Sequence, residues 1–229
     1  ALARAFPPPA TTLAVTEIVA VPGQGLEGCV DGESLRIGTR AFVLGRAGDS
    51  AADNGPVAEG RVGAGTGCTV GKVLGMGHAS PGGTGTASVD LGGGLVVGAI
   101  VVVNAFGDVV DPRTGQILAG ARHLSGEGWA DTLATMKGLI GKTVLRFAGR
   151  SHTVIGVVAT NARLTKEGAN KVAQMAHNGL ARAIRPAHTM LDGDTLFALA
   201  TGKKAADVNL VGAYAAEVVA EAIVRAVNH

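Results

Sequence analysis

Residues 153–186 read TVIGVVATNARLTKEGANKVAQMAHNGLARAIRP, and the spacing of apolar residues changes partway along this stretch. Residues 153–160 are rich in β-branched side chains, which favours a strand. Thr165 is a suitable N-cap, and Pro186 should end the helix that follows it. Apolar residues recur at helical spacing between the two, at Val172, Ala173, Ala176, Leu180, Ala183 and Ile184. The stretch therefore predicts a strand followed by an amphipathic helix.

Similar signals lie on both sides of this stretch. Further strands are predicted at 87–90, 95–103, 143–147 and 195–200, with a turn at 92–94, a hairpin segment at 107–120 and a final helix at 205–227. The run 95–103 is apolar at almost every position, as expected of a strand that is covered on both faces. Strands bracketed by long helices predict sheets covered by helices, which is an α/β (α+β) fold.

Composition limits the possible functions. The chain has 229 residues, is 47% hydrophobic and 17% charged, and carries a formal net charge of +2, which fits a soluble globular protein. Lys and Arg are scattered and aromatic residues make up only 3%, so no nucleic-acid partner is expected. Two cysteines, Cys29 and Cys68, form no C-x-x-C motif and are expected to be cytoplasmic thiols.

Three regions are expected along the chain. Residues 1–45 have a separate character, with a Pro-rich lead and short strands at 16–21, 28–30 and 34–37. Residues 46–60 are small and polar, as in a linker, and 61–229 form the main domain. No signal peptide is recognised at the start, and the longest apolar run is about half of a membrane span. We therefore expect a cytoplasmic protein with no membrane partner.

Two glycine-rich motifs invite nucleotide-binding interpretations. Residues 23–28 satisfy G-x-G-x-x-G, but a hairpin turn follows where a dinucleotide site needs a helix. Residues 63–72 approach a P-loop, yet Thr66 stands where glycine is needed and Val73 replaces the magnesium-binding Ser or Thr. Lys72 then remains either a solvated side chain or a buried cation in a substrate-facing loop.

The polar residues give weaker signals. The six histidines form no zinc-binding spacing, and His177 and His188 are interpreted as groups on the surface or at the end of a helix. Asp192 and Asp194 flank Gly193 just before a strand, so their carboxylates should point roughly the same way. A solvated β-turn is the alternative interpretation, and calcium is not expected with two ligands.

Residues 15–43 resemble a fragment of the nucleotide-binding domain of heavy-metal P-type ATPases. With the alanine that precedes them, they read AVTEIVAVPGQGLEGCVDGESLRIGTRAFV. The resemblance covers roughly the first 45 residues. The phosphorylated D-K-T-G-T motif of that family does not occur in the chain. A nucleotide-binding module is therefore retained only as an alternative function.

From Asn54 onward the chain resembles the D-aminopeptidase/esterase (DmpA-like) family, which includes β-aminopeptidases and nylon-oligomer hydrolases. The segments that carry this resemblance are GPVAEGRVGAGTGCTVGK, GTASVDLGGGLVVGAIVVVNAFGDVVDPRTGQILAGAR, TVIGVVATNARLTK and AHNGLARAIRPAHTMLDGDTLFALATG. They occur in the family's order and spacing. The family's N-terminal portion, with its SGGSAxGL-like helix start, is not recognised in this chain.

The resemblance implies self-cleavage before a Ser or Thr, which corresponds here to Thr153. The bond between His152 and Thr153 would be cut, giving an α part to residue 152 and a β part over 153–229. The freed α-amine could then act as general base for the threonine hydroxyl, because its pKa of about 8 lies close to working pH. The residue before the nucleophile is usually Asn or Gly in the family.

The resemblance also implies roles for four further residues. Asp192 and Asp194 match acidic or polar partners of the nucleophile and its amine. Asn104 matches an oxyanion donor, a kind of group typically worth about 10²–10³ in rate. Lys72 matches a lysine near the nucleophile, where it could stabilise negative charge or lower the pKa of the amine.

Together these features predict a four-layer αββα sandwich of the N-terminal-nucleophile-hydrolase type. The expected enzyme forms an acyl-enzyme on Thr153 and hydrolyses short peptides, amino-acid amides or oligoamides, with neither metal nor cofactor. A homo-oligomer, commonly a tetramer in the family, is expected. The alternatives are an inactive or truncated homologue that is not processed, and the nucleotide-binding module.

Overall fold

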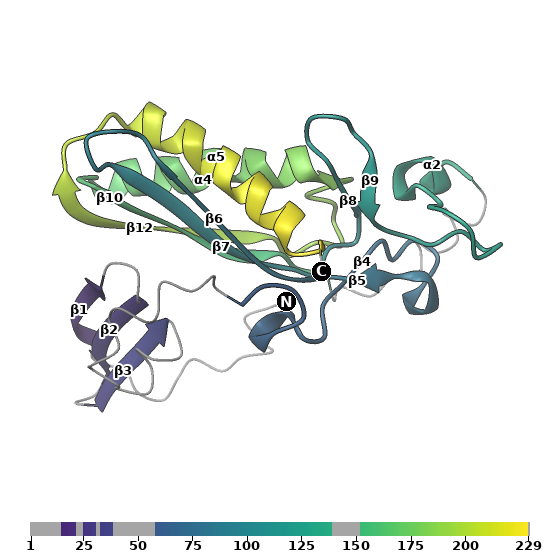
Figure 1. Ribbon diagram of the computed structural model, residues 1–229, viewed down its shortest axis with the longest axis horizontal. Coiled ribbons are helices and arrows are strands. Elements are labelled where there is room, and N and C mark those ends of the chain that lie inside the picture. The colour runs from purple at the N-terminus through teal and green to yellow at the C-terminus, as the bar shows by residue number, and fades with distance from the viewer. Residues whose placement is uncertain (1–14, 22–24, 31–32, 39–57, 139–151, 229) are drawn as a thin grey trace. The chain divides into compact units, whose positions relative to one another are not determined.

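The computed structural model describes residues 15–21, 25–30, 33–38, 58–138 and 152–228. The chain divides into two compact units, Ala1–Val57 and Ala58–His229. The first unit contains an antiparallel meander of β1 (Val15–Val21), β2 (Gly25–Val30) and β3 (Glu33–Gly38) (Figure 1). The G-x-G-x-x-G motif thus runs into a strand, which agrees with the predicted hairpin and lacks the helix that a dinucleotide site needs.

The second unit is built on one four-stranded sheet. Its order is β12 (Thr195–Lys204), β10 (Ile155–Ala162), β7 (Val96–Val103) and β6 (Gly83–Asp90). The strands β10 and β12 are parallel, whereas β7 is antiparallel to both β10 and β6. The parallel pair needs a crossover connection, and the predicted helix after β10 provides it.

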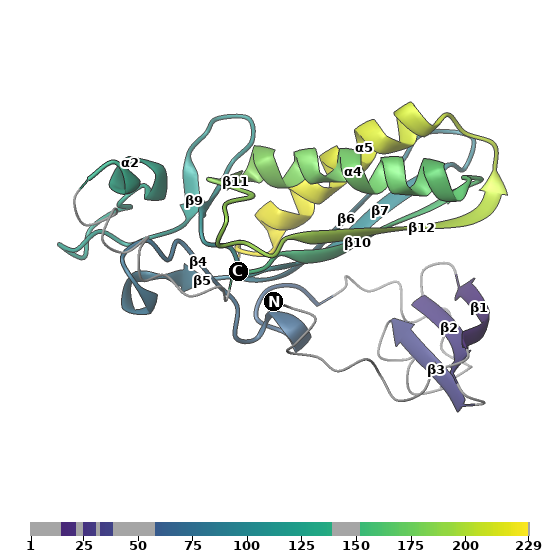
Figure 2. The same ribbon diagram turned by 180° about the vertical axis from the view of Figure 1, so that it is seen from behind.

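Two long helices cover one face of this sheet (Figures 1 and 2). They are α4 (Lys166–Ala183) and α5 (Val208–Arg225). The Thr165 side chain caps α4 by accepting from Gly168 N at 3.1 Å, as the sequence predicts, and Asp207 caps α5 in the same way. Among the described residues, no helix is long and apolar enough to cross a membrane.

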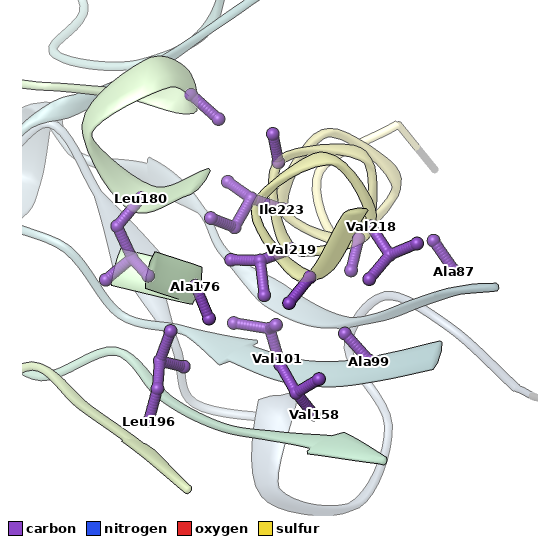
Figure 3. Close-up of a cluster of buried hydrophobic side chains, with 14 of the residues drawn as sticks. Ala87, Ala99, Val101, Val158, Ala176, Leu180, Leu196, Val218, Val219 and Ile223 are labelled. Atoms are coloured by element: carbon purple, nitrogen blue, oxygen red, sulfur yellow. The ribbon is translucent and has the colours of Figure 1, made fainter. Parts of the chain in front are cut away.

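The hydrophobic core lies between the helices and the sheet. Val101 and Val158 point from β7 and β10 toward Leu180 of α4 and Val219 and Ile223 of α5 (Figure 3). Small residues allow close packing here, since a Cβ on Gly179 would lie 2.4 Å from the Ala216 carbonyl oxygen. The predicted apolar stripe of each helix therefore forms the core face.

The opposite face of the sheet carries exposed apolar side chains. Ile100 is 44% exposed and Phe197 is 53% exposed, and the two flank Val157 in one cross-strand row. Other exposed residues of this face are Val96, Ile155 and Leu199. The sequence predicted that residues 95–103 are covered on both sides, and in the described part of the chain this is wrong. An apolar run alone cannot separate a fully buried strand from one with an uncovered apolar face.

Short elements lie around one end of the main sheet (Figure 1). They are η2 (Gly63–Gly65), β4 (Thr69–Val70), η3 (Met76–His78), β5 (Ser80–Pro81), β8 (Asp108–Val110), β9 (Ile117–Ala119), α2 (Thr132–Met136) and β11 (Ile184–Arg185). The hairpin predicted within 107–120 is confirmed as β8 and β9. The predicted strand at 143–147 and most of the predicted linker lie outside the described residues.

Candidate active site

Thr153 lies where β10 begins and β7 ends. These two strands are antiparallel, with Ile155 opposite Val102, so Thr153 comes next to Asn104. Its backbone N–H donates to the Asn104 carbonyl oxygen at 3.0 Å, which continues the ladder of the two strands. The strand register therefore fixes the backbone of Thr153 at the end of the sheet.

The hydroxyl of Thr153 lies against the peptide bond that precedes it. Its Oγ1 donates to the carbonyl oxygen of His152 at 2.8 Å. The backbone N–H of Gly193 donates to the same oxygen, also at 2.8 Å. A Cβ at position 193 would lie 2.9 Å from Thr153 Oγ1, so this position accommodates glycine and little else. The His152 carbonyl is thus polarised by two donors, one of which is the hydroxyl that could attack it.

Lys72 is buried and bonded to Asn104. Its Nζ donates to Asn104 Oδ1 at 2.7 Å and to the Asn104 carbonyl oxygen at 3.2 Å. Oδ1 also accepts from the backbone N–H of Thr69 at 3.2 Å, and two donors on one atom identify it as the oxygen of the amide. The Asn104 carbonyl oxygen is therefore shared by Lys72 Nζ and Thr153 N, which brings the lysine close to the nucleophile segment.

The environment of Lys72 makes its ammonium group easier to deprotonate. Its side chain belongs to a residue that is only 5% exposed, and burial lowers its pKa to about 8. Cys68 and Asp192 oppose this shift. The interpretation of Lys72 as a solvated side chain is therefore wrong, because the chain around β4 folds it against Asn104.

Asp192 holds the loop that contains Gly193. Its Oδ2 accepts from Thr189 Oγ1 at 2.7 Å and from Thr189 N at 3.0 Å, while Oδ1 accepts from Phe106 N at 3.3 Å. The carboxylate thus joins this loop to the segment just after Asn104. Its bonds fix the position of the neighbouring Gly193 N–H relative to the His152 carbonyl.

Asp194 bonds the residue that follows the nucleophile. Its Oδ1 accepts from Val154 N at 2.9 Å, and its Oδ2 lies 3.3 Å from Nδ1 of His188. The pKa of Asp194 is raised, mainly by burial and further by Asp192. The Val154 N–H and His188 oppose this shift. These contacts replace the solvated β-turn that was the alternative interpretation of the Asp-Gly-Asp sequence.

His152 is enclosed at the position before the nucleophile. It is 6% exposed, and its ring lies 5.5 Å from that of the fully buried Phe106, at an interplanar angle of 52°. A parallel bridge also pairs His152 with Asp192. The peptide bond between His152 and Thr153 is therefore held in place from both of its sides.

All five residues singled out in the sequence lie at this one end of the sheet. Thr153, Asn104 and Lys72 are linked by hydrogen bonds. Asp194 accepts from Val154 N next to the nucleophile, and Asp192 accepts from Phe106 N, two residues after Asn104. Two further residues were missed. Gly193 carries its signal in the flanking aspartates, whereas His188 gives no local signal and was interpreted as a helix-end group.

Comparison with solved structures identifies the class of fold. The L-aminopeptidase D-Ala-esterase/amidase of Ochrobactrum anthropi, described as a new variant among the Ntn-hydrolase folds, superposes with a TM-score of 0.50. The identity is 22%, and the match covers 81% of this chain and 52% of the other. The fold is therefore that of an N-terminal-nucleophile hydrolase, as the sequence predicts, and the described sheet with α4 and α5 corresponds to part of it.

Sequence comparison gives the family. The model of peptidase family S58 matches residues 26–229, and the chain belongs to this family. The match includes residues 26–45, which were expected to have a separate character.

Named relatives agree with this assignment. An uncharacterized aminopeptidase of Mycobacterium leprae is 48% identical over 147 residues, covering 64% of this chain and 38% of its own. A 6-aminohexanoate-oligomer endohydrolase of Paenarthrobacter ureafaciens is 30% identical over 197 residues, covering 80% of this chain and 55% of its own. The chain thus spans about half the length, or less, of these curated relatives.

Proposed function

We propose that this chain is a self-processing amide hydrolase whose nucleophile is Thr153. The observation that carries the proposal is the position of the Thr153 hydroxyl, 2.8 Å from the carbonyl oxygen of its own preceding peptide bond. That oxygen also receives the Gly193 N–H, which would stabilise the negative charge of a tetrahedral intermediate. The first substrate is thus the His152–Thr153 bond itself.

Self-cleavage would proceed by an acyl shift. Thr153 Oγ1 bonds to the His152 carbonyl carbon, the C–N bond to Thr153 breaks, and the leaving nitrogen takes a proton. Water then hydrolyses the resulting ester to give a carboxylate at His152 and a free α-amine at Thr153. Before cleavage no α-amine exists, so another base must take the hydroxyl proton. Lys72 suits this step because its pKa is lowered to about 8 and it shares the Asn104 carbonyl oxygen with Thr153 N.

After cleavage the same site would act on external amides. The freed amine of Thr153 replaces the peptide nitrogen beside Asn104 and can serve as base for its own hydroxyl. Positive charge on Lys72 would keep the pKa of this amine low. Asn104 would donate from its amide nitrogen to the oxyanion, since Lys72 and Thr69 hold its oxygen. Hydrolysis of the acyl-enzyme then regenerates Thr153.

The proposed substrates are short peptides, amino-acid amides or oligoamides. The printed names of the relatives, an aminopeptidase and a 6-aminohexanoate-oligomer endohydrolase, support this class. The proposed reaction uses only side chains and backbone groups and needs no cofactor. We also propose that the protein is cytoplasmic and forms a homo-oligomer. The reason for the homo-oligomer is that association would cover the exposed apolar residues of the main sheet.

Intact-mass analysis tests the processing step. Purified chain should appear as two pieces, residues 1–152 and 153–229, and Thr153→Ala should stay whole. Thr201→Ala is the matched control, since Thr201 is exposed on the same sheet and should leave cleavage unchanged. A single uncut chain in the wild type would remove the proposal and favour an unprocessed homologue.

Activity and ligand assays separate the remaining alternatives. Amino-acid p-nitroanilides and 6-aminohexanoate oligomers are suitable probes for the cleaved chain, and Thr153→Ala should hydrolyse neither. Calorimetric titration with ATP tests the nucleotide-binding alternative, for which a measurable heat of binding is required.

A further inference from the structure

His188 occupies an unusual position between α4 and the Asp-Gly-Asp loop. Its backbone has φ of 55°, a left-handed conformation that Asn, Asp and His tolerate better than most other residues. Its ring is placed between two oxygen atoms. Nδ1 lies 3.3 Å from Asp194 Oδ2, and Nε2 lies 3.4 Å from the carbonyl oxygen of His177.

Counting protons shows what this arrangement requires. A neutral imidazole has one N–H and one acceptor nitrogen, so it can donate to only one of the two oxygens. The second nitrogen would then face an oxygen lone pair. Both contacts become donations only when an additional proton is present, carried by His188 as imidazolium or shared with the Asp194 carboxylate. The geometry therefore places the His188 imidazole and the Asp194 carboxylate in ion-pair contact.

The carboxylate of Asp194 needs such a partner. Its side chain is 5% exposed, so water has little access, and only Oδ1 is bonded to the chain segment of the nucleophile, through Val154 N. Oδ2 faces His188. A protonated Asp194 would be a poorer acceptor for the Val154 N–H, and the first residue of the nucleophile strand would be held less firmly.

We propose that His188 is a positioning residue, which keeps Asp194 ionised and aimed at the nucleophile segment by forming an ion pair with its Oδ2. The importance of this pair for catalysis rests on the proposed function, whereas the pairing itself rests on the two contacts of the His188 ring. Removal of the imidazole then makes protonation of Asp194 easier, because His188 lowers the pKa of this carboxyl.

Other titratable groups face the pair. His177 of α4 has its ring 5.3 Å from that of His188, and burial lowers its pKa, with His188 lowering it further and Asp194 opposing. Asp192 raises the pKa of Asp194, and Lys72 in turn interacts with Asp192. His177 is thus disfavoured as a cationic partner of Asp194, and the ring that contacts Oδ2 is that of His188.

Imidazole NMR tests the coupling without any need for activity. The sample is the full chain carrying Thr153→Ala, so that it remains uncut, with and without Asp194→Asn. We expect the His188 titration midpoint to fall by about one pH unit or more when the carboxylate is removed, as for an opposite charge within hydrogen-bonding range. An unchanged midpoint would overturn the proposal.

A pH profile tests the positioning role in the chain with Thr153 intact. His188→Asn suits the left-handed backbone and keeps a donor without the charge, while His188→Gly relaxes the backbone and has no side chain. Both should move the acid limb of the rate of self-cleavage, and of p-nitroanilide hydrolysis, toward higher pH by about one unit. His177→Gln is the matched control and should leave that limb in place.

The outcomes of the two experiments remain distinguishable. An unshifted acid limb in both His188 variants overturns the positioning role, even when their rates fall, because a structural defect alone lowers the rate without moving the limb. If the wild type is neither cleaved nor active, the proposed function fails, and the NMR titration still decides whether the pair exists.

Discussion

Replacement of Lys72 by Met should stabilise the fold while it removes activity. Lys72 is buried, and its pKa falls from 10.5 to about 8 in the folded chain. At 1.36 kcal/mol per unit, this means that its charge costs roughly 3 kcal/mol of stability at pH 7. Methionine has a similar shape and carries no charge. The variant also loses two hydrogen bonds to Asn104, worth about 1 kcal/mol each, so it should be more stable by about 1 kcal/mol.

The pH dependence of stability gives a second measure of the free-energy cost of the Lys72 charge. Between pH 8 and 10.5 the unfolded chain binds more protons at Lys72 than the folded chain does. The stability of the parent chain should therefore rise with pH in this window, as its lysine loses the proton, and the contribution should be absent from Lys72→Met. Below pH 8 the difference between the two chains should stay constant.

Urea unfolding followed by circular dichroism measures both effects. The comparison is made in a Thr153→Ala background, which keeps every chain uncut. Lys171→Met is the matched control, because Lys171 is exposed on α4 and because lysine and methionine have similar helix propensities. With Thr153 restored, Lys72→Met should slow self-cleavage by about 10²-fold or more. The reasoning is refuted if Lys72→Met is less stable at pH 7 than its parent, or if both chains respond equally to pH.

Three further predictions concern the nucleophile, the glycine beside it and a buried aspartate. Thr153→Ser should still be cleaved, whereas Thr153→Ala should remain one piece on a denaturing gel; cleavage of the alanine variant would exclude this nucleophile. Gly193→Ala places a Cβ 2.9 Å from Thr153 Oγ1 and should slow cleavage by about 10²-fold in a gel time course, while Gly77→Ala, with open space around it, should match the wild type. Asp108 is fully buried and accepts from Thr132 N and Oγ1, both at 2.6 Å. Asp108→Asn would set an amide N–H against one of these donors and should lower the free energy of unfolding by about 2 kcal/mol in urea titrations. An unchanged free energy of unfolding would contradict the stabilising role of this carboxylate.

Much of the local structure follows from the sequence. The spacing of apolar residues, the cap at Thr165 and the helix-ending Pro186 predict β10 and α4 to within a few residues, because these signals depend on neighbours a few positions away. The matching segments also predict the family and the residues that gather at the end of the sheet. What the run 95–103 could not predict is that one of its faces is exposed, since its apolar residues fit either environment.

The sequence by itself therefore determined the elements, the family and the set of candidate residues. Only the tertiary structure decided which of their atoms meet. Lys72 reaches Asn104 across 32 positions, and Gly193 N–H reaches the carbonyl of His152 across a segment that contains β10 and α4. His188 contacts Asp194, six positions further along, although their spacing forms no recognised motif. Such contacts depend on strand register and on the path of the connecting loops, which residue spacing does not encode.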